Sequence, residues 1–177
     1  MTPSWIFSQR LLALALALSL LAPLAISPAN AEDAPPACSA PAYRQFDFWL
    51  GEWRVTLADG AVAGTNRVTS LLGGCALQEN WTGVSLLTGQ SLNAYDSVRG
   101  VWRQNWVDSG GSSLVLEGGW NGTAMVLEGA TVGEKTTTHH RISWTPIDPR
   151  QVRQIWATRE GESGEWVIAF DGLYTKQ

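Results

Sequence analysis

Alternating tryptophan and polar side chains after residue 101 are the first feature of this sequence that could do chemistry. On a β-strand, Trp102, Gln104 and Trp106 share one face, because side chains point alternately to opposite sides. Two indole rings with an amide between them form a stacking surface with a polar handle, which suits flat or apolar ligands. The segment therefore predicts either the wall of a binding pocket or a tryptophan-packed core with a few hydrogen-bonded polar groups.

The same pairing of tryptophan with one polar side chain recurs later in the chain. His140 and Trp144 have even spacing, as do Gln154 and Trp156, so the members of each pair share a strand face. These positions predict two further walls and an imidazole that could orient a ligand.

Glu79 is a carboxylate whose same-face neighbours, Leu77 and Trp81, are apolar. Burying that face without a partner costs several kcal/mol or raises the pKa of the carboxyl group. We therefore expect Glu79 to find Arg103, Arg141 or an amide as its partner. Its role stays open: a group that orients a ligand or accepts a proton inside a barrel, an internal ion pair, or a carboxylate in water at a barrel mouth.

Common catalytic and metal-binding patterns are missing from the sequence. No Gly-x-Ser-x-Gly elbow occurs, and His139 and His140 are the only imidazoles. Because these two neighbours point to opposite strand faces, one strand supplies one inward ligand, and no cluster has the spacing of a zinc site. We expect no catalytic triad, no metal and no cofactor, and a chain that is not an enzyme or only a weak one.

Alternation of apolar and polar residues is typical of the chain from Gly51 onward. Trp53, Val55 and Leu57 alternate with polar neighbours and predict the first strand. Further strands are predicted at residues 62–72, 75–84, 89–96, 101–108, 112–119, 123–131, 136–145, 151–159 and 165–175.

Ten short strands joined by tight turns predict an all-β domain. Asn121-Gly122 is the strongest hairpin signal, because both turn positions favour positive φ. An open meander of this length would expose two sheet edges, whereas closure removes them. We therefore predict a closed antiparallel up-and-down barrel of about ten strands, lipocalin-like, preceded by a short helical turn at residues 43–50. A two-sheet sandwich is the alternative.

Residues 1–31 have the order of a secretory signal peptide: Arg10 precedes an apolar run, and a small-x-small site (ANA) ends the segment. Pro23 interrupts the run, so a membrane span is not expected. Residues 32–42 predict an extended leader rich in proline and alanine, and residues 43–177 predict a single barrel domain. The protein is predicted to be periplasmic or secreted.

Charge and composition argue against several partners. The chain has 12 basic and 16 acidic side chains, and its net charge falls from −4 to −5 when Arg10 is removed with the signal peptide. Scattered bases on an acidic chain offer no surface for nucleic acid or for anionic lipid. Nine of the ten tryptophans follow residue 31, and each buries roughly 150–250 Å², so we expect a strongly aromatic interior.

Cys38 and Cys75 are the only cysteines. In an oxidising compartment an even pair predicts a disulfide, which would join the leader to the strand at residues 75–84. Lipid attachment at Cys38 is the alternative. The preceding Ala-Pro-Pro-Ala lacks the usual aliphatic residue and lies far from the apolar run, so the disulfide is favoured.

Five motifs resemble the sequence of a family of secreted bacterial domains of unknown function. They are FDFWLGEW, GCALQENW, SLNAYD, WRQNWVD and FDGLYTK, at residues 46–53, 74–81, 91–96, 102–108 and 170–176. The resemblance covers nearly all of the chain after the leader. It implies a lipocalin-like, calycin-type barrel and transfers no catalytic residue.

The short run WLGEW, at residues 49–53, is also similar to the start of nitrobindin-type haem barrels. Those proteins place their haem-ligating histidine close to the C-terminus, whereas no histidine follows His140 here. This difference in the position of the histidine argues against haem binding.

The leading hypothesis is an exported barrel that binds a small apolar or aromatic molecule in an internal cavity. The candidate wall residues are Trp81, Trp102, Trp106, Trp144 and Trp156, and the candidate polar groups are Glu79, Gln104 and His140.

Two other hypotheses come from different classes. One is a protein-binding or structural barrel with a filled core and an exposed aromatic patch of Phe46, Phe48 and Trp49. The other is a cavity isomerase or cyclase that uses Glu79. The sequence does not set the oligomeric state.

Overall fold

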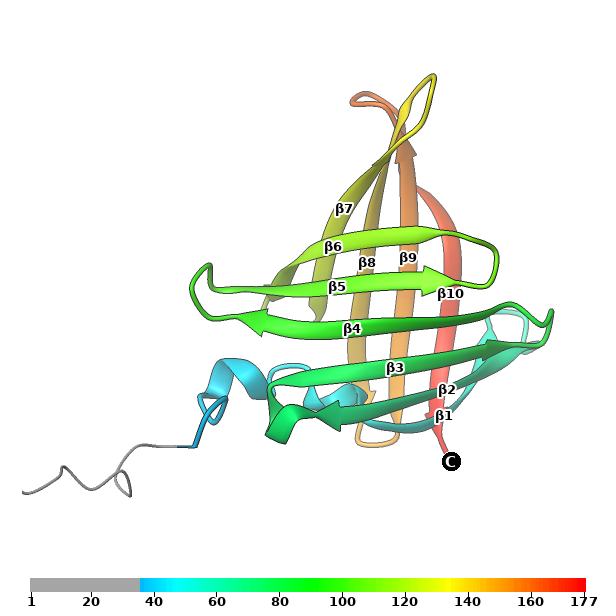
Figure 1. The fold of residues 1–177 in the computed structure, drawn as a ribbon. Helices are drawn as coiled ribbons and strands as arrows, with labels where there is room; N and C mark the ends of the chain where they lie inside the picture. Colours follow the sequence, from blue (N-terminus) through cyan, green and yellow to red (C-terminus); the bar gives the residue numbers. More distant parts are fainter. Residues whose placement is uncertain (1–35) are drawn as a thin grey trace, which may run out of the picture. The chain divides into compact units, whose positions relative to one another are not determined.

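The computed structural model describes residues 36–177, which form a closed antiparallel β-barrel (Figure 1). Consecutive strands pair with one another, and β1 (Gly51–Leu57) pairs with β10 (Val167–Lys176) to close the ring. The prediction of an all-β, up-and-down barrel of about ten strands is confirmed, and the sandwich alternative is wrong. The signal peptide predicted for residues 1–31 lies outside the described residues.

The strands form where inward and outward side chains alternate. In β1, Trp53 and Val55 are buried whereas Glu52 and Arg54 are exposed. The other strands are β2 (Val62–Leu71), β3 (Ala76–Gly83), β4 (Thr88–Asp96), β5 (Val101–Asp108), β6 (Ser113–Trp120), β7 (Met125–Val132), β8 (Thr137–Asp148) and β9 (Gln151–Glu160). Each lies where the alternation predicted a strand, and no end differs by more than three residues.

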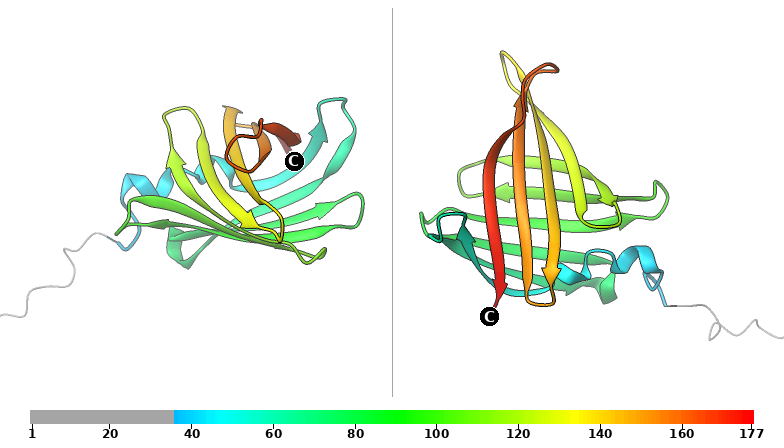
Figure 2. Two further views of the ribbon diagram at one scale, coloured as in Figure 1. Left: turned by 90° about the horizontal axis from the view of Figure 1, so that it is seen from above. Right: turned by 180° about the vertical axis from the view of Figure 1, so that it is seen from behind.

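The barrel has two walls that cross at a steep angle. Strands β3 to β6 form one wall and β8 to β10 form the other (Figure 1), and the view from behind shows the second wall in front (Figure 2). The seam between β1 and β10 runs from Trp53 opposite Lys176 to Leu57 opposite Gly172. The inward side chains of both walls therefore face one shared interior.

The hairpin between β6 and β7 differs from its prediction. Its loop has four residues, and the backbone N–H of Asn121 donates to the carbonyl of Ala124 at 3.0 Å. Of these residues only Gly122 has positive φ, at 102°. The side-chain Oδ1 of Asn121 accepts from the N–H groups of Thr123 and Ala124 at 3.0 and 2.9 Å. The hairpin predicted at Asn121-Gly122 is confirmed, but the expectation of positive φ at both positions is wrong, because the asparagine side chain caps a four-residue loop.

The predicted N-terminal helical turn is present as two short 3-10 turns, η2 (Pro41–Arg44) and η3 (Asp47–Trp49). No helix among residues 36–177 has the length and apolarity needed to cross a bilayer. The turns carry Phe46 and Trp49 into one end of the barrel, and these two rings are stacked with centroids 4.9 Å apart.

Four rings at this end form what we call the aromatic plug: Phe46, Trp49, Trp102 and Trp144. The ring of Phe46 meets those of Trp102 and Trp144 edge-on, with centroids 5.6 and 5.2 Å away. All four side chains are essentially fully buried. The exposed patch predicted at Phe46, Phe48 and Trp49 is therefore wrong, since the first and last of these rings close the barrel instead of facing solvent.

The predicted disulfide between Cys38 and Cys75 is present, with the two Cα atoms 5.0 Å apart. Cys75 directly precedes β3, and Arg44 of η2 donates to the carbonyl oxygen of the adjacent Gly74. The covalent bond and the guanidinium together fasten the turns that carry the plug to the start of β3.

Truncating Phe46 to alanine should destabilise the barrel by about 3–5 kcal/mol, because it removes a fully buried ring and leaves a void among three indoles. Urea unfolding followed by tryptophan fluorescence measures the loss. The control is Val98→Ala in the β4–β5 turn, where the side chain is 95% exposed. It should change the free energy of unfolding by less than about 0.5 kcal/mol. Similar values for the two variants would contradict the role of the plug.

Replacing both cysteines with serine should lower the free energy of unfolding by about 4 kcal/mol, because the bond links residues 37 positions apart. Urea unfolding in oxidising and reducing buffer measures this. Reduction should destabilise the wild-type protein by the same amount and leave the double variant unchanged. A wild-type protein indifferent to reduction would contradict the expectation.

Candidate functional site

A cavity of about 420 Å³ lies inside the barrel, at the end opposite the aromatic plug. Its lining includes Leu57 at the end of β1, Val62 at the start of β2 and Leu87 in the β3–β4 loop. These positions belong to the edge of the barrel where β1, β3 and β5 end, whereas the plug packs where β5 begins. The barrel is therefore a cup that is filled at one end and hollow at the other.

Aromatic side chains supply much of the cavity wall: Trp81, Trp106, Trp156, Phe170 and Tyr174. The indole of Trp106 lies against Gly89, where an added Cβ would stand 2.1 Å from the ring. The ring of Trp81 lies against Gly64, where the corresponding distance is 2.9 Å. Glycine at these two positions lets the indoles approach the backbone closely and leaves the middle of the cavity open.

Five buried polar side chains on β2 to β5 form one hydrogen-bond network. Asn66 Nδ2 and Ser91 Oγ donate to Glu79 Oε1 and Oε2 at 2.8 and 2.6 Å. Asn93 Nδ2 donates to Ser91 Oγ, and Gln104 Nε2 donates to Asn93 Oδ1, both at 2.9 Å. None of the five side chains belongs to a residue more than 4% exposed. Glu79 and Gln104 reach the cavity surface, so the network presents two polar groups on a mostly apolar wall.

Burial raises the pKa of Glu79 from 4.5 to about 7, because the ionised form loses its hydration. The hydrogen bonds from Ser91 and Asn66 favour the ionised form and limit the rise. At neutral pH the Glu79 side chain is therefore divided between its charged and uncharged forms, and a ligand that interacts with one form shifts the balance.

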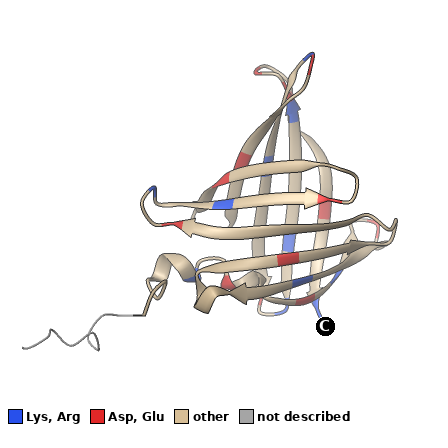
Figure 3. Cartoon of the chain, in the orientation of Figure 1, with Lys and Arg blue, Asp and Glu red and all other residues tan. Residues whose placement is uncertain are grey.

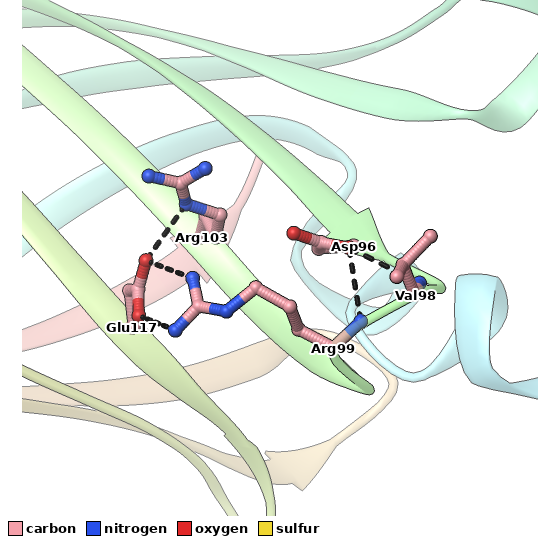
Figure 4. Close-up of polar contacts among 5 residues, drawn as sticks. All are labelled: Asp96, Val98, Arg99, Arg103 and Glu117. Atoms are coloured by element: carbon pink, nitrogen blue, oxygen red, sulfur yellow. Dashed lines mark hydrogen bonds and ion pairs between the residues drawn. The ribbon is translucent and has the colours of Figure 1, made fainter.

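The arginines expected as partners of this carboxylate face outward. Arg103 Nε lies 2.9 Å from Glu117 Oε1, in the surface cluster of Figure 4, and Arg141 pairs with Glu128. The prediction of an arginine partner is wrong, and the prediction of an amide partner is confirmed by Asn66. Glu79 has neutral hydrogen-bond donors and no cationic partner among the described residues.

Tyr174 adds a phenol to the same cavity. Its hydroxyl donates to Gln154 Oε1. Burial, and then the charge of Glu79, raise the pKa of Tyr174 well above its ordinary value. The phenol therefore stays protonated, with its one proton donated to Gln154, whereas Glu79 can accept a further hydrogen bond.

Eight residues were predicted as ligand-binding, and the structure brings five of them together. The five that line the cavity are Glu79, Trp81, Gln104, Trp106 and Trp156. They come from β3, β5 and β9, so the two walls of the barrel both contribute.

The other three, Trp102, Trp144 and His140, do not line the cavity. Trp102 and Trp144 belong to the plug. His140 accepts from Trp156 Nε1 at its Nδ1, at 3.2 Å, which leaves its Nε2 to donate to Thr131 Oγ1, at 2.9 Å. Burial lowers the pKa of His140, which favours this neutral tautomer. The hydrogen bond to His140 thus fixes the position of the Trp156 indole.

Sequence reasoning missed Asn66, Ser91 and Asn93, which complete the polar network. A signal was available for Asn66, which has the same strand parity as Val68, but not for Ser91 and Asn93, because the apolar Leu92 between them lies on the other face. Together with Glu79 on β3, these residues place polar side chains at inward positions of the three neighbouring strands β2, β3 and β4. Polar groups placed in this way form a network rather than isolated side chains.

No group of three or more His, Cys, Asp and Glu side chains in the described part of the chain is arranged to hold a metal ion. Comparison of the sequence with protein-family models and with curated proteins gives no match. The barrel fits the lipocalin-like fold implied by the motif resemblance, and the function is argued from the cavity itself.

Glu79→Gln should flatten the dependence of stability on pH. The pKa of Glu79 is about 7 in the folded protein, whereas its ordinary value is 4.5. The folded protein therefore holds this proton more tightly than the unfolded chain does, and the resulting stability, complete below pH 4.5, is lost as the pH rises through 7. Between about pH 5 and pH 8 the wild type should lose about 2–3 kcal/mol that the variant keeps.

Urea unfolding at a series of pH values measures this difference. The matched control is Glu128→Gln, which removes an outer carboxylate paired with Arg141 and should follow the wild-type profile. Parallel profiles for Glu79→Gln and the wild type would show that Glu79 titrates normally.

Proposed function

We propose that this protein is an exported barrel that binds a small apolar or aromatic molecule in its cavity. One observation carries the proposal: a hollow of about 420 Å³, lined mostly by apolar side chains that include five aromatic rings, in a barrel whose other end is tightly filled. A core packed only for stability approaches the density of an organic crystal. Ligand pockets, in contrast, are mostly apolar hollows of about 300–1,000 Å³.

The placement of the polar groups supports a ligand held in one orientation. Glu79 and Gln104 lie on the wall of β3 to β6, next to the indoles of Trp81 and Trp106. Trp156 lies on the opposite wall. A flat molecule between the walls would stack on indole faces and direct one polar group toward Glu79 or Gln104.

Export is part of the proposal, and two features support it. The disulfide between Cys38 and Cys75 is typical of an oxidising compartment. The first 31 residues have the pattern of a secretory signal.

A cavity isomerase or cyclase is the second candidate, and one observation favours it. Glu79 is a buried carboxyl group with a pKa of about 7, near the ideal value for a general base at neutral pH, in a cavity that also holds the phenol of Tyr174. A normal titration of Glu79 in the folded protein would remove this candidate. The filled, protein-binding barrel has no such support, because the interior is hollow.

Binding of the neutral dye N-phenyl-1-naphthylamine tests the leading proposal. The dye should gain fluorescence and quench tryptophan emission, because the cavity wall is mostly apolar and places indoles around the ligand. Trp106→Ala should weaken binding about tenfold, since stacking on an indole contributes about 1 kcal/mol or more.

The matched control is Trp166→Ala. This indole lies outside the cavity lining, beneath the guanidinium groups of Arg141 and Arg159, so its removal should leave dye affinity unchanged. Absence of dye binding, or an equal loss in both variants, would contradict the proposal.

A further inference from the structure

The cavity lining carries negative charge without positive charge. Within residues 36–177 its ionisable side chains are Glu79, Asp108 and Tyr174, and no lysine, arginine or histidine belongs to it. An anionic ligand such as a fatty acid would meet two carboxyl groups and no counter-charge, which disfavours it.

Acceptors outnumber donors around Glu79. An ionised carboxylate has about four lone-pair sites, and Asn66 and Ser91 occupy two of them. Because Asn66 donates through Nδ2, its Oδ1 is a further acceptor, and this buried oxygen has no donor among the described residues. Glu79 lines the cavity whereas Asn66 does not, so a ligand that brings positive charge would interact with the carboxylate of Glu79 itself.

Asp108 places a second carboxylate at the open end of the cavity. Its Oδ2 accepts from Trp106 Nε1 at 3.2 Å, and its Oδ1 accepts from the N–H groups of Gly110 and Ser112 at 2.9 and 3.0 Å. Desolvation alone would raise the pKa of Asp108, but the hydrogen bonds from Ser112, Trp106 and Gly110 together outweigh it and lower the pKa. Asp108 is therefore ionised at neutral pH, on the edge of an indole that faces the cavity.

The loops at the open end extend the negative charge outward. They span residues 58–61, 84–87, 109–112, 133–136 and 161–166 and contain four acidic side chains and one lysine. Figure 3 shows acidic and basic positions together on the hairpin that joins β7 and β8. Glu162 pairs with Arg159 and His139, and the remaining excess of acidic over basic side chains attracts cations toward the opening and repels anions.

We propose that the cavity selects organic cations, namely protonated or quaternary amines attached to an apolar or aromatic body. The inference rests on the ligand-binding function proposed above and names the class of ligand. The ammonium group would lie near Glu79 and against the faces of Trp81 and Trp106, because indole attracts cations through its π-face. The apolar body would fill the space beside Trp156 and Phe170.

Three probes of similar shape test the inference on the protein that is produced when the full-length sequence is expressed. Benzyltrimethylammonium is the cation, neopentylbenzene replaces its nitrogen with carbon, and phenylmethanesulfonate is the anion. Their affinities are measured by displacement of N-phenyl-1-naphthylamine. The cation should bind at least about tenfold more tightly than the neutral probe, and the anion should bind most weakly.

Glu79→Gln should reduce the preference for the cation over the neutral probe to about threefold or less, by removing the buried charge. Glu128→Gln, on the outer surface, should preserve the wild-type preference. Circular dichroism of both variants checks that the barrel is intact.

The affinity for benzyltrimethylammonium should also rise as the pH increases through about 7, because Glu79 loses its proton there. The probe has a permanent charge, so its own ionisation does not contribute. The groups that face Glu79 from β2 and β4 are uncharged, Tyr174 stays neutral and Asp108 stays ionised. The pH response should therefore be absent in Glu79→Gln.

The outcomes separate the two proposals. Dye binding with equal or stronger displacement by the neutral or anionic probe, or with no displacement by the cation, would overturn the selectivity and leave the binding function standing. A preference for the cation that survives in Glu79→Gln would overturn the assigned role of that residue. Failure of the dye and of all three probes to bind would overturn the binding function itself.

Discussion

The backbone ladder between β1 and β10 is the interaction on which the rest of the structure depends. It joins Trp53 through Leu57 to Lys176 through Gly172 and turns a meander with two exposed edges into a ring. Only in a closed ring does the alternation of side chains define an inside and an outside. The plug, the polar network and the cavity are all consequences of that closure, since each uses inward side chains from strands far apart in the chain.

The two ends of the barrel are filled differently, and this difference creates the cavity. At one end the turns that follow Cys38 insert Phe46 and Trp49 between Trp102 and Trp144. No comparable segment of residues 36–177 enters the other end, where indoles lie against glycines. A tightly packed half can supply stability, while the other half keeps a hollow that costs packing energy.

The polar network has a similar balance between stability and function. A carboxyl group without a cation destabilises the interior when it ionises, and Glu79 is held there by Asn66 and Ser91, which satisfy hydrogen bonds without neutralising charge. A nearby arginine would have neutralised the carboxylate and left less charge for a ligand to interact with. Arg103 and Arg141 are instead paired outside with Glu117 and Glu128, so the interior keeps its unmatched acceptor.

The strands, their order and the face on which each side chain lies could be predicted from the residues alone, because strand periodicity is local and every connection is short. The sequence also predicted the disulfide, since two cysteines allow one pairing, and it contained the reason that Arg103 faces outward, since its neighbour Gln104 faces inward. The depth of each side chain along the barrel could not be predicted in this way and follows from the folded arrangement. Trp102 and Trp106 share a face of β5, yet they stand about 13 Å apart along the strand, one in the plug and the other in the cavity. Periodicity cannot distinguish those two positions, because the distinction depends on which end of the closed ring the N-terminal turns occupy.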